Sequence, residues 1–165
     1  MPRLITAILL VLALPHLAMA NSVDAVFAGA EKIGESTFRA LGRPIYNARL
    51  YTQNGRAFDW NQDFALLINY QRNISQKDIV ETTLREMKRM GSRPPIDNQL
   101  RNCFSAVGKG DQYLAVTDGP NQVSFWRNFK PVCTLINPQI KRRFMSIFLG
   151  ENSRSAKFTK ELRGE

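Results

Sequence analysis

The sequence has little histidine and little cysteine, two side chains on which many enzymes and metal sites depend. Its 165 residues contain one histidine, His16, and two cysteines. His16 lies in an N-terminal segment that we expect to be removed, so the mature chain has no imidazole. This excludes Ser-His-Asp and Cys-His nucleophilic sites and histidine-ligated metal centres, and two cysteines alone do not make a structural zinc site. We therefore predict no metal and no cofactor.

The sequence also lacks an apolar run of the roughly 20 residues that a membrane-spanning helix needs. The run Leu4–Leu14 is shorter; it follows Arg3 and is followed by Pro15 and by the small-x-small sequence Ala18-Met19-Ala20. This order is typical of a secretory signal peptide. We expect residues 1–20 to be cleaved after Ala20, leaving one exported, periplasmic domain over residues 21–165. A retained membrane anchor is the alternative.

Acidic residues are outnumbered, and the net charge of +9 falls to +8 when Arg3 is removed. The densest basic stretch, Lys141-Arg142-Arg143, is flanked by Ile140 and Phe144. Such a stretch is compatible with nucleic acid or an anionic membrane, but also with the solvent face of an amphipathic helix. We favour the solvent face. Export argues against nucleic acid, whereas the overall charge favours weak contact with an anionic membrane surface.

The two cysteines, Cys103 and Cys133, form an even pair in a chain that we expect to be exported. In an oxidising compartment such a pair favours a disulfide over two free thiols. The bond would tie a helix end to a strand.

Two groups of strands flank two helices in the sequence pattern. Residues 45–52 alternate, with Tyr46, Ala48 and Leu50 on one side and Asn47, Arg49 and Tyr51 on the other, which is typical of a sheet with one wetter face. Phe64–Tyr70 is apolar on both sides and predicts a central strand covered on each face. The predicted strands are 31–41, 45–52, 64–70, 112–117, 123–128 and 131–135.

Helical spacing of apolar residues appears in four segments. Ser75 and Asp78 predict a helix start, and the pattern continues to a stop at Gly91. Pro94-Pro95 open a shorter helix. Asn137-Pro138 predict an N-cap and a first helical position, and a last amphipathic turn or helix covers 155–162. The pattern predicts an α+β fold with an antiparallel sheet rather than a doubly wound parallel one.

Five polar residues within the predicted strands are candidate ligand contacts. Arg39 and Arg49 would anchor the carboxylate or phenolate of a small molecule, since guanidinium is a forked and permanently charged donor. The alternative is a solvated sheet face or a surface ion pair. Tyr46, Tyr51 and Tyr70 would turn hydroxyls toward a ligand, or serve in packing.

Several blocks, in order along nearly the whole mature chain, resemble bacterial exported chalcone isomerase-like proteins. The blocks are Phe38–Gly42, Ile45–Thr52, Phe64–Ile74, Glu86-Met87, Lys109–Asp111 and Phe144–Ser153. The resemblance implies an open-faced β-sandwich: a large antiparallel sheet with helices packed on one face and a cleft between them. Relatives either close a flavonoid ring or bind fatty acids through an Arg and a Tyr, so the fold does not choose between them.

The plant enzymes' catalytic residues do not map onto this chain. Their arginine falls at Ser36 or Thr37 and their strand threonine near Tyr46 or Asn47, so we transfer no catalytic residue. We expect a non-catalytic protein that binds a small apolar or amphipathic ligand, such as a fatty acid or lipid, between sheet and helices. One alternative is an isomerase, an intramolecular lyase acting on a chalcone-like unsaturated ketone. The other is an envelope interaction protein without a pocket.

Overall fold

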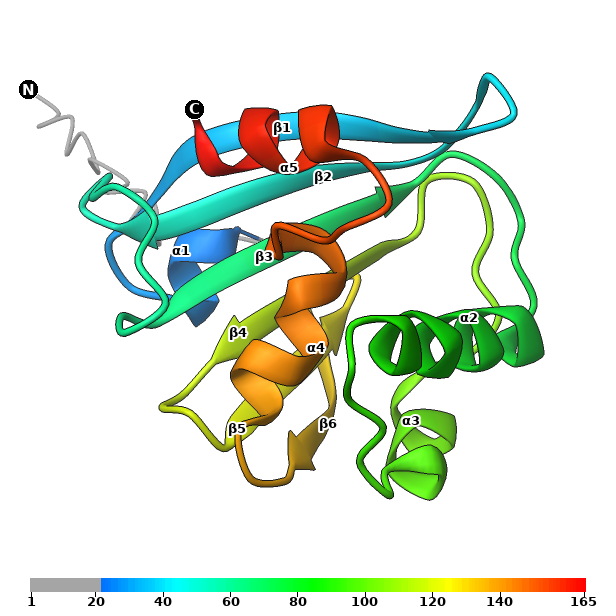
Figure 1. Ribbon diagram of the computed structural model, residues 1–165. Coiled ribbons are helices and arrows are strands. Elements are labelled where there is room, and N and C mark those ends of the chain that lie inside the picture. Colours follow the sequence, from blue (N-terminus) through cyan, green and yellow to red (C-terminus); the bar gives the residue numbers. More distant parts are fainter. Residues whose placement is uncertain (1–21) are drawn as a thin grey trace, which may run out of the picture.

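The computed structural model describes residues 22–165, so the predicted signal peptide, residues 1–20, lies outside the described part of the chain. Within residues 22–165 the chain forms a six-stranded antiparallel sheet in which each strand pairs with the one before it (Figure 1). The strands are β1 (Ala30–Ala40), β2 (Arg43–Gln53), β3 (Phe64–Tyr70), β4 (Gln112–Thr117), β5 (Gln122–Arg127) and β6 (Lys130–Ile136).

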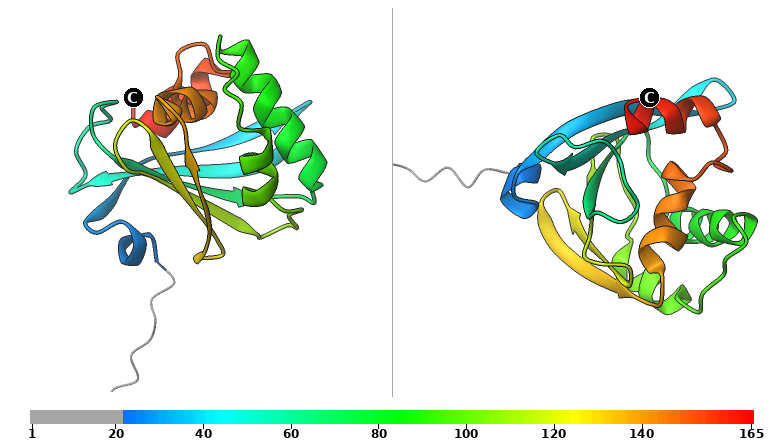
Figure 2. Two further views of the ribbon diagram at one scale, coloured as in Figure 1. Left: turned by 90° about the horizontal axis from the view of Figure 1, so that it is seen from below. Right: turned by 60° about the vertical axis from the view of Figure 1, so that its left-hand side comes forward.

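Helices cover the two faces of the sheet unequally. Figure 2 shows α2, α4 and α5 on one face and the short α1 on the other. The main core lies under the larger helical layer, whereas a smaller apolar cluster forms between the sheet and α1. The helices are α1 (Val23–Val26), α2 (Gln76–Arg89), α3 (Asp97–Cys103), α4 (Ile140–Leu149) and α5 (Ala156–Arg163). The predicted α+β fold, with an antiparallel sheet and helices packed on one face, is confirmed.

The strand β3 has the two-sided burial that its sequence predicts. Phe64 and Leu66 belong to the main core, and Ala65 and Leu67 belong to the cluster on the other face. Every residue of β3 except Asn69 is buried. Because both faces are covered, β3 is the central strand on which the layers are assembled.

The helix α2 begins and ends where its capping residues predict. The Ser75 hydroxyl oxygen accepts a hydrogen bond from the Asp78 backbone N–H at 3.1 Å and satisfies one free donor of the first turn. The helix stops before Gly91, whose φ of +81° suits a residue without a side chain. The helix thus lies across the sheet with Val80 and Met87 fully buried.

The predicted start of α4 at Asn137-Pro138 is wrong, because the helix begins at Ile140. Gln139 takes the N-cap position with a left-handed φ of 59°. Its backbone N–H donates to the Asn121 side-chain oxygen at 2.8 Å, which fixes residues 137–139 against the turn between β4 and β5. A tertiary contact therefore replaces the local capping that the sequence predicts.

The prediction that Lys141 lies on a solvated face is also wrong. Lys141 is buried, and its ammonium group donates to the Asp63 carboxylate at 3.2 Å and to the Gln62 carbonyl at 3.1 Å. The neighbouring Arg142 lies over the Trp60 ring, with its guanidinium carbon 4.9 Å from the ring centroid. These contacts fasten α4 to the loop before β3, so two of the three basic residues serve packing.

A disulfide joins α3 to the edge of the sheet. Cys103 at the end of α3 is bonded to Cys133 on β6, with 5.2 Å between their Cα atoms. The helix itself begins at Asp97, two residues after the predicted opening at Pro94-Pro95. The bond links a helix end to a strand, as the cysteine pair predicts.

The last helix packs closely on the first strand. A Cβ atom added at Gly34 in β1 would lie on the backbone carbonyls of Glu161 and Leu162 in α5. The Ser36 hydroxyl donates to the Glu161 carboxylate at 2.6 Å. The absence of a side chain at Gly34 lets α5 approach β1, and this contact closes one side of the cleft between the sheet and the helices.

Candidate functional site

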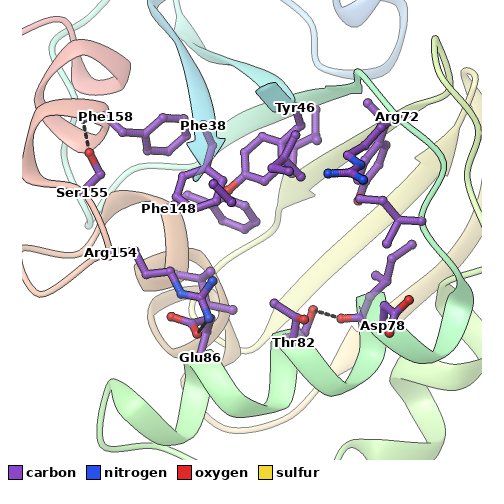
Figure 3. A pocket seen from close by; sticks show the side chains of 18 of the residues that line it. Phe38, Tyr46, Arg72, Asp78, Thr82, Glu86, Phe148, Arg154, Ser155 and Phe158 are labelled. Atoms are coloured by element: carbon purple, nitrogen blue, oxygen red, sulfur yellow. Dashed lines mark hydrogen bonds and ion pairs between the residues drawn. The ribbon is translucent and has the colours of Figure 1, made fainter. Parts of the chain in front are cut away.

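A pocket of about 370 Å³ lies between the sheet and the helical layer. Its floor comes from the ends of β1, β2 and β3, and its walls come from α2, the end of α4 and the start of α5 (Figure 3). Ligand pockets of proteins range from about 300 to 1,000 Å³, so this one suits a small molecule. The site therefore lies in the cleft that the chalcone isomerase-like resemblance predicts.

Aromatic rings form much of the pocket wall. Phe38 and Tyr46 stack with their ring centroids 5.3 Å apart, and Phe148 and Phe158 meet Tyr46 edge-on at 6.1 and 6.0 Å. The remaining apolar lining comes from five isoleucines and an alanine: Ile45, Ile68, Ile74, Ile79, Ile147 and Ala40. Such a surface favours hydrocarbon over water.

Two phenol hydroxyls are set in this apolar lining. Neither Tyr46 nor Tyr70 has a side-chain hydrogen bond to any of residues 22–165, and both line the pocket. Burial raises the pKa of Tyr46; Tyr70 and Glu86 raise it further and Arg154 partly offsets them. Burial likewise raises the pKa of Tyr70, with Tyr113 adding to it. Both phenols therefore stay protonated and offer hydrogen-bond donors to a bound molecule.

A buried carboxylate and three arginines form one end of the site. Glu86 on α2 is 3% exposed; it accepts a hydrogen bond from Arg154 and another from Arg89 at 2.8 Å, and Arg85 lies 4.0 Å away. Burial would raise the pKa of Glu86, but the hydrogen bonds from Arg154 and Arg89 outweigh it and hold that pKa below its usual range. One ionised carboxylate facing three guanidinium groups leaves an excess of positive charge there.

Arg72 supplies a second cation on the far side of the pocket from Arg154, as Figure 3 shows. Its side chain is exposed and has no ion-pair partner among residues 22–165. Asp78 also lines this side, where its carboxylate accepts a hydrogen bond from the Ser75 hydroxyl at 2.7 Å. The pocket is therefore apolar in its middle and carries cationic groups at both ends.

The predicted ligand contacts divide between the two faces of the sheet. Tyr46 and Tyr70 line the pocket together. Arg49 and Tyr51 lie on the opposite face, because they alternate with the buried Ala48 and Leu50 along β2. Tyr51 packs against the smaller cluster beside α1.

The two predicted anchoring arginines do not meet in the pocket. Arg49 pairs with Glu35, with 3.2 Å between its Nε and the carboxylate. Arg39 follows a register irregularity after Phe38 and is exposed, with its guanidinium donating to the Gly42 carbonyl at 3.3 Å. Both arginines therefore make surface contacts, as the alternative interpretation predicts: a solvated sheet face or a surface ion pair.

Arg39 does line a second, more polar hollow of about 530 Å³ along the free edge of β1. Its walls include Glu35, Ser36 and Glu161, whose side chains already make ion pairs or hydrogen bonds. Phe38 and Phe158 line this hollow too, but the rest of its lining is polar or charged, so we place the candidate site in the first pocket.

Sequence reasoning missed Glu86, Arg154 and Arg72 as pocket residues. A signal for Glu86 was present: it follows Ile79 by seven positions and Thr83 by three, so it falls within the apolar stripe of its helix. An acid in such a stripe requires a cationic partner. Nothing in the sequence spacing identifies that partner as Arg154, which comes from a loop 68 residues later.

No protein-family model matches the chain, and no curated protein matches it. Among solved structures the chain is similar to a fatty-acid binding protein of Arabidopsis thaliana, with a TM-score of 0.63 and 9% sequence identity. The similarity covers 83% of this chain and 88% of that one. At this identity the likeness shows the fold alone, and the fold is chalcone isomerase-like.

Residues 22–165 lack two further features, a helix able to cross a membrane and a cluster of metal-binding side chains. None of the helices in that part of the chain has the length and hydropathy needed to cross a bilayer. The same residues contain no cluster of three or more His, Cys, Asp or Glu side chains placed to hold a metal ion.

Proposed function

We propose that this protein binds a fatty acid, or an amphipathic anion of similar shape, in the pocket between sheet and helices, without catalysing a reaction. The observation that carries the proposal is the apolar, aromatic pocket that Tyr46 and Arg154 both line, in which the Tyr46 hydroxyl has no hydrogen-bond partner among residues 22–165. The Tyr46 hydroxyl is therefore free to donate a hydrogen bond to a bound molecule. The fold shared with a fatty-acid binding protein supports the same function.

The pocket suggests how such a ligand would lie. The carboxylate would accept hydrogen bonds from the Tyr46 hydroxyl and from the Arg154 guanidinium, since charge-assisted hydrogen bonds of this kind are strong. The hydrocarbon chain would follow the aromatic wall of Phe38, Phe148 and Phe158. Glu86 would hold Arg154 in place from behind, because its carboxylate binds the same guanidinium.

We also propose that the chain is a bacterial exported member of the chalcone isomerase-like proteins and works in the periplasm. The features that support export are the signal-like residues 1–20 and the disulfide between Cys103 and Cys133, because disulfides persist in oxidising compartments. A ligand with a hydrocarbon chain fits that location, since the envelope is rich in lipids.

The test is titration with a fatty acid, read by native mass spectrometry and by displacement of a fluorescent fatty acid. Tyr46→Phe removes the hydroxyl and keeps the ring, so we expect affinity to fall about tenfold, the value of a hydrogen bond to a charged group. Tyr51→Phe is the matched control on the other face of the sheet and should bind like the wild type.

A second variant tests the guanidinium without leaving a buried charge. Replacing Arg154 and Glu86 together by Gln keeps the pair neutral and should weaken binding of a carboxylate while preserving binding of the corresponding alcohol. If neither wild type nor variants bind a fatty acid, the proposed function is wrong. Turnover of a chalcone by the wild type, followed by absorbance, would instead favour the isomerase.

A further inference from the structure

The turn between β1 and β2 exposes a leucine in an unfavourable backbone conformation. Leu41 and Gly42 have φ values of 49° and 75°, so both lie in the left-handed region. The Leu41 side chain is 102% exposed, and a β-hairpin turn with this geometry strongly favours Asn followed by Gly. Leucine here gains no packing and strains the backbone, so folding stability does not explain it.

Cationic side chains flank this leucine. Arg39 and Arg43 lie two residues before and two residues after it, and neither has a carboxylate partner among residues 22–165. Arg39 donates to the Gly42 carbonyl at 3.3 Å and so stays at the turn. The turn therefore presents one apolar side chain between two unneutralised charges.

The turn also adjoins the mouth of the pocket. Ala40 and Ile45, which bracket it, both line the pocket, and Arg72 stands on the rim beyond them. Figure 1 places this turn and the start of α2 at the same end of the molecule. A surface that contacts the turn would thus lie next to the entrance of the site.

We propose that the β1–β2 turn, residues 39–43, docks the protein on an anionic lipid bilayer. Leu41 enters the boundary between headgroups and acyl chains, and Arg39 and Arg43 contact lipid phosphates. Charge complementarity favours this occupant over a second copy of the chain, since each copy carries +8 once Arg3 is removed with the leader. This docking rests on the proposed function and extends it, because the bilayer would be the place where the pocket takes up or releases its ligand.

The test is co-sedimentation of the protein with lipid vesicles. The protein is expressed from the full sequence, including residues 1–20, so that the cell itself carries out any processing of the N-terminus. We expect binding to vesicles of phosphatidylglycerol and phosphatidylcholine, and much weaker binding to phosphatidylcholine alone or at high salt. Leu41→Asn should lower the partition coefficient about tenfold, because it removes the inserted side chain. The same variant should melt no lower than the wild type, because Asn suits the turn. Arg39→Gln and Arg43→Gln should each lower the partition coefficient about fivefold.

Ile136→Asn is the matched control, since Ile136 is an exposed apolar residue on β6, at the opposite edge of the sheet. It should bind vesicles like the wild type. Equal losses in Leu41→Asn and Ile136→Asn, or no wild-type binding to the anionic vesicles, would overturn the proposal. A wild-type dimer that Leu41→Asn dissociates would assign the turn to a second copy instead. Fatty-acid titration without vesicles is a separate measurement, so failure of docking is distinguishable from failure of the ligand site.

Discussion

At the scale of single residues, Asp111 fastens the corner where the second strand group begins. Its carboxylate accepts hydrogen bonds from the Gly108 backbone N–H at 2.8 Å, from Arg127 at 2.8 Å and from the Asn128 amide at 2.9 Å. The Asn128 amide, the Gly108 N–H and the Arg127 guanidinium lower the pKa of Asp111 from 3.8 to about 2. The folded state therefore favours the ionised form.

This shift predicts a specific loss of stability in acid. Because the pKa is lowered on folding, the stabilisation is present above pH 3.8 and is lost as the pH falls toward 2. We expect Asp111→Asn to reduce the free energy of unfolding by about 1 kcal/mol at neutral pH, after allowance for solvent screening. The difference between wild type and variant should shrink between pH 4 and pH 2, as urea unfolding at several pH values would measure. A difference that stays constant over that range would contradict the assignment.

The candidate site shows which side chains the sequence could identify. Tyr46 and Tyr70 were predictable because strand alternation sets their faces relative to buried neighbours. The position of Arg39 was less predictable, because the register irregularity after Phe38 interrupts the alternation of side chains at the end of β1. The Glu86 and Arg154 pair depends on a loop meeting a helix, which no local pattern encodes.

At the scale of elements, the contact between β1 and α5 depends on Gly34. Gly34→Ala would place a methyl group on rigid backbone carbonyls, so α5 would have to move. We expect a loss of about 1–3 kcal/mol in the free energy of unfolding, measured by chemical denaturation. Gly108→Ala is the matched control, because the atoms nearest its Cβ position are at 3.6 Å, an ordinary contact. Equal stability of the two variants would argue against the close approach.

The disulfide stabilises another pair of elements, α3 and β6. It closes a segment with a sequence separation of 30, so the entropy of the unfolded chain predicts a contribution of about 3.6 kcal/mol. Reduction should lower the melting temperature of the wild type. The variant with Cys103→Ala and Cys133→Ala should have a melting temperature close to that of the reduced wild type, and the reductant should not change it. If the reductant does not change the melting temperature of the wild type either, the bond contributes little to stability.

The types of the elements after the short α1 were predictable because periodicity is a local property, but some boundaries were not, and α1 itself was not predicted. The helix α2 has its own capping residue and stop, and its limits follow from the sequence. The start of α4 instead depends on Asn121, which holds Gln139 from across the sheet. The solvent exposure of Lys141 was wrongly predicted for a related reason. Its ammonium group can be buried because the Asp63 carboxylate and the Gln62 carbonyl, both distant in sequence, accept its hydrogen bonds.

At the scale of the whole molecule, the predicted leader and the disulfide lead to one expectation about maturation. We expect the protein recovered from the periplasm to begin at Asn21, which intact-mass measurement would establish. Ala20→Arg should block cleavage, because signal peptidase requires small residues at that position. A mature mass that includes Met1 would contradict the proposed export.

The packing of α5 on β1 has a consequence for how the chain is made. Ser36 and Glu161, hydrogen-bonded in the folded protein, are 125 residues apart, and α5 follows every other described helix and strand along the chain. The first strand therefore lacks its cover until α5 has been synthesised, and the core closes only then. For the export that we propose, the chain must reach the export machinery before it folds, and this arrangement delays folding.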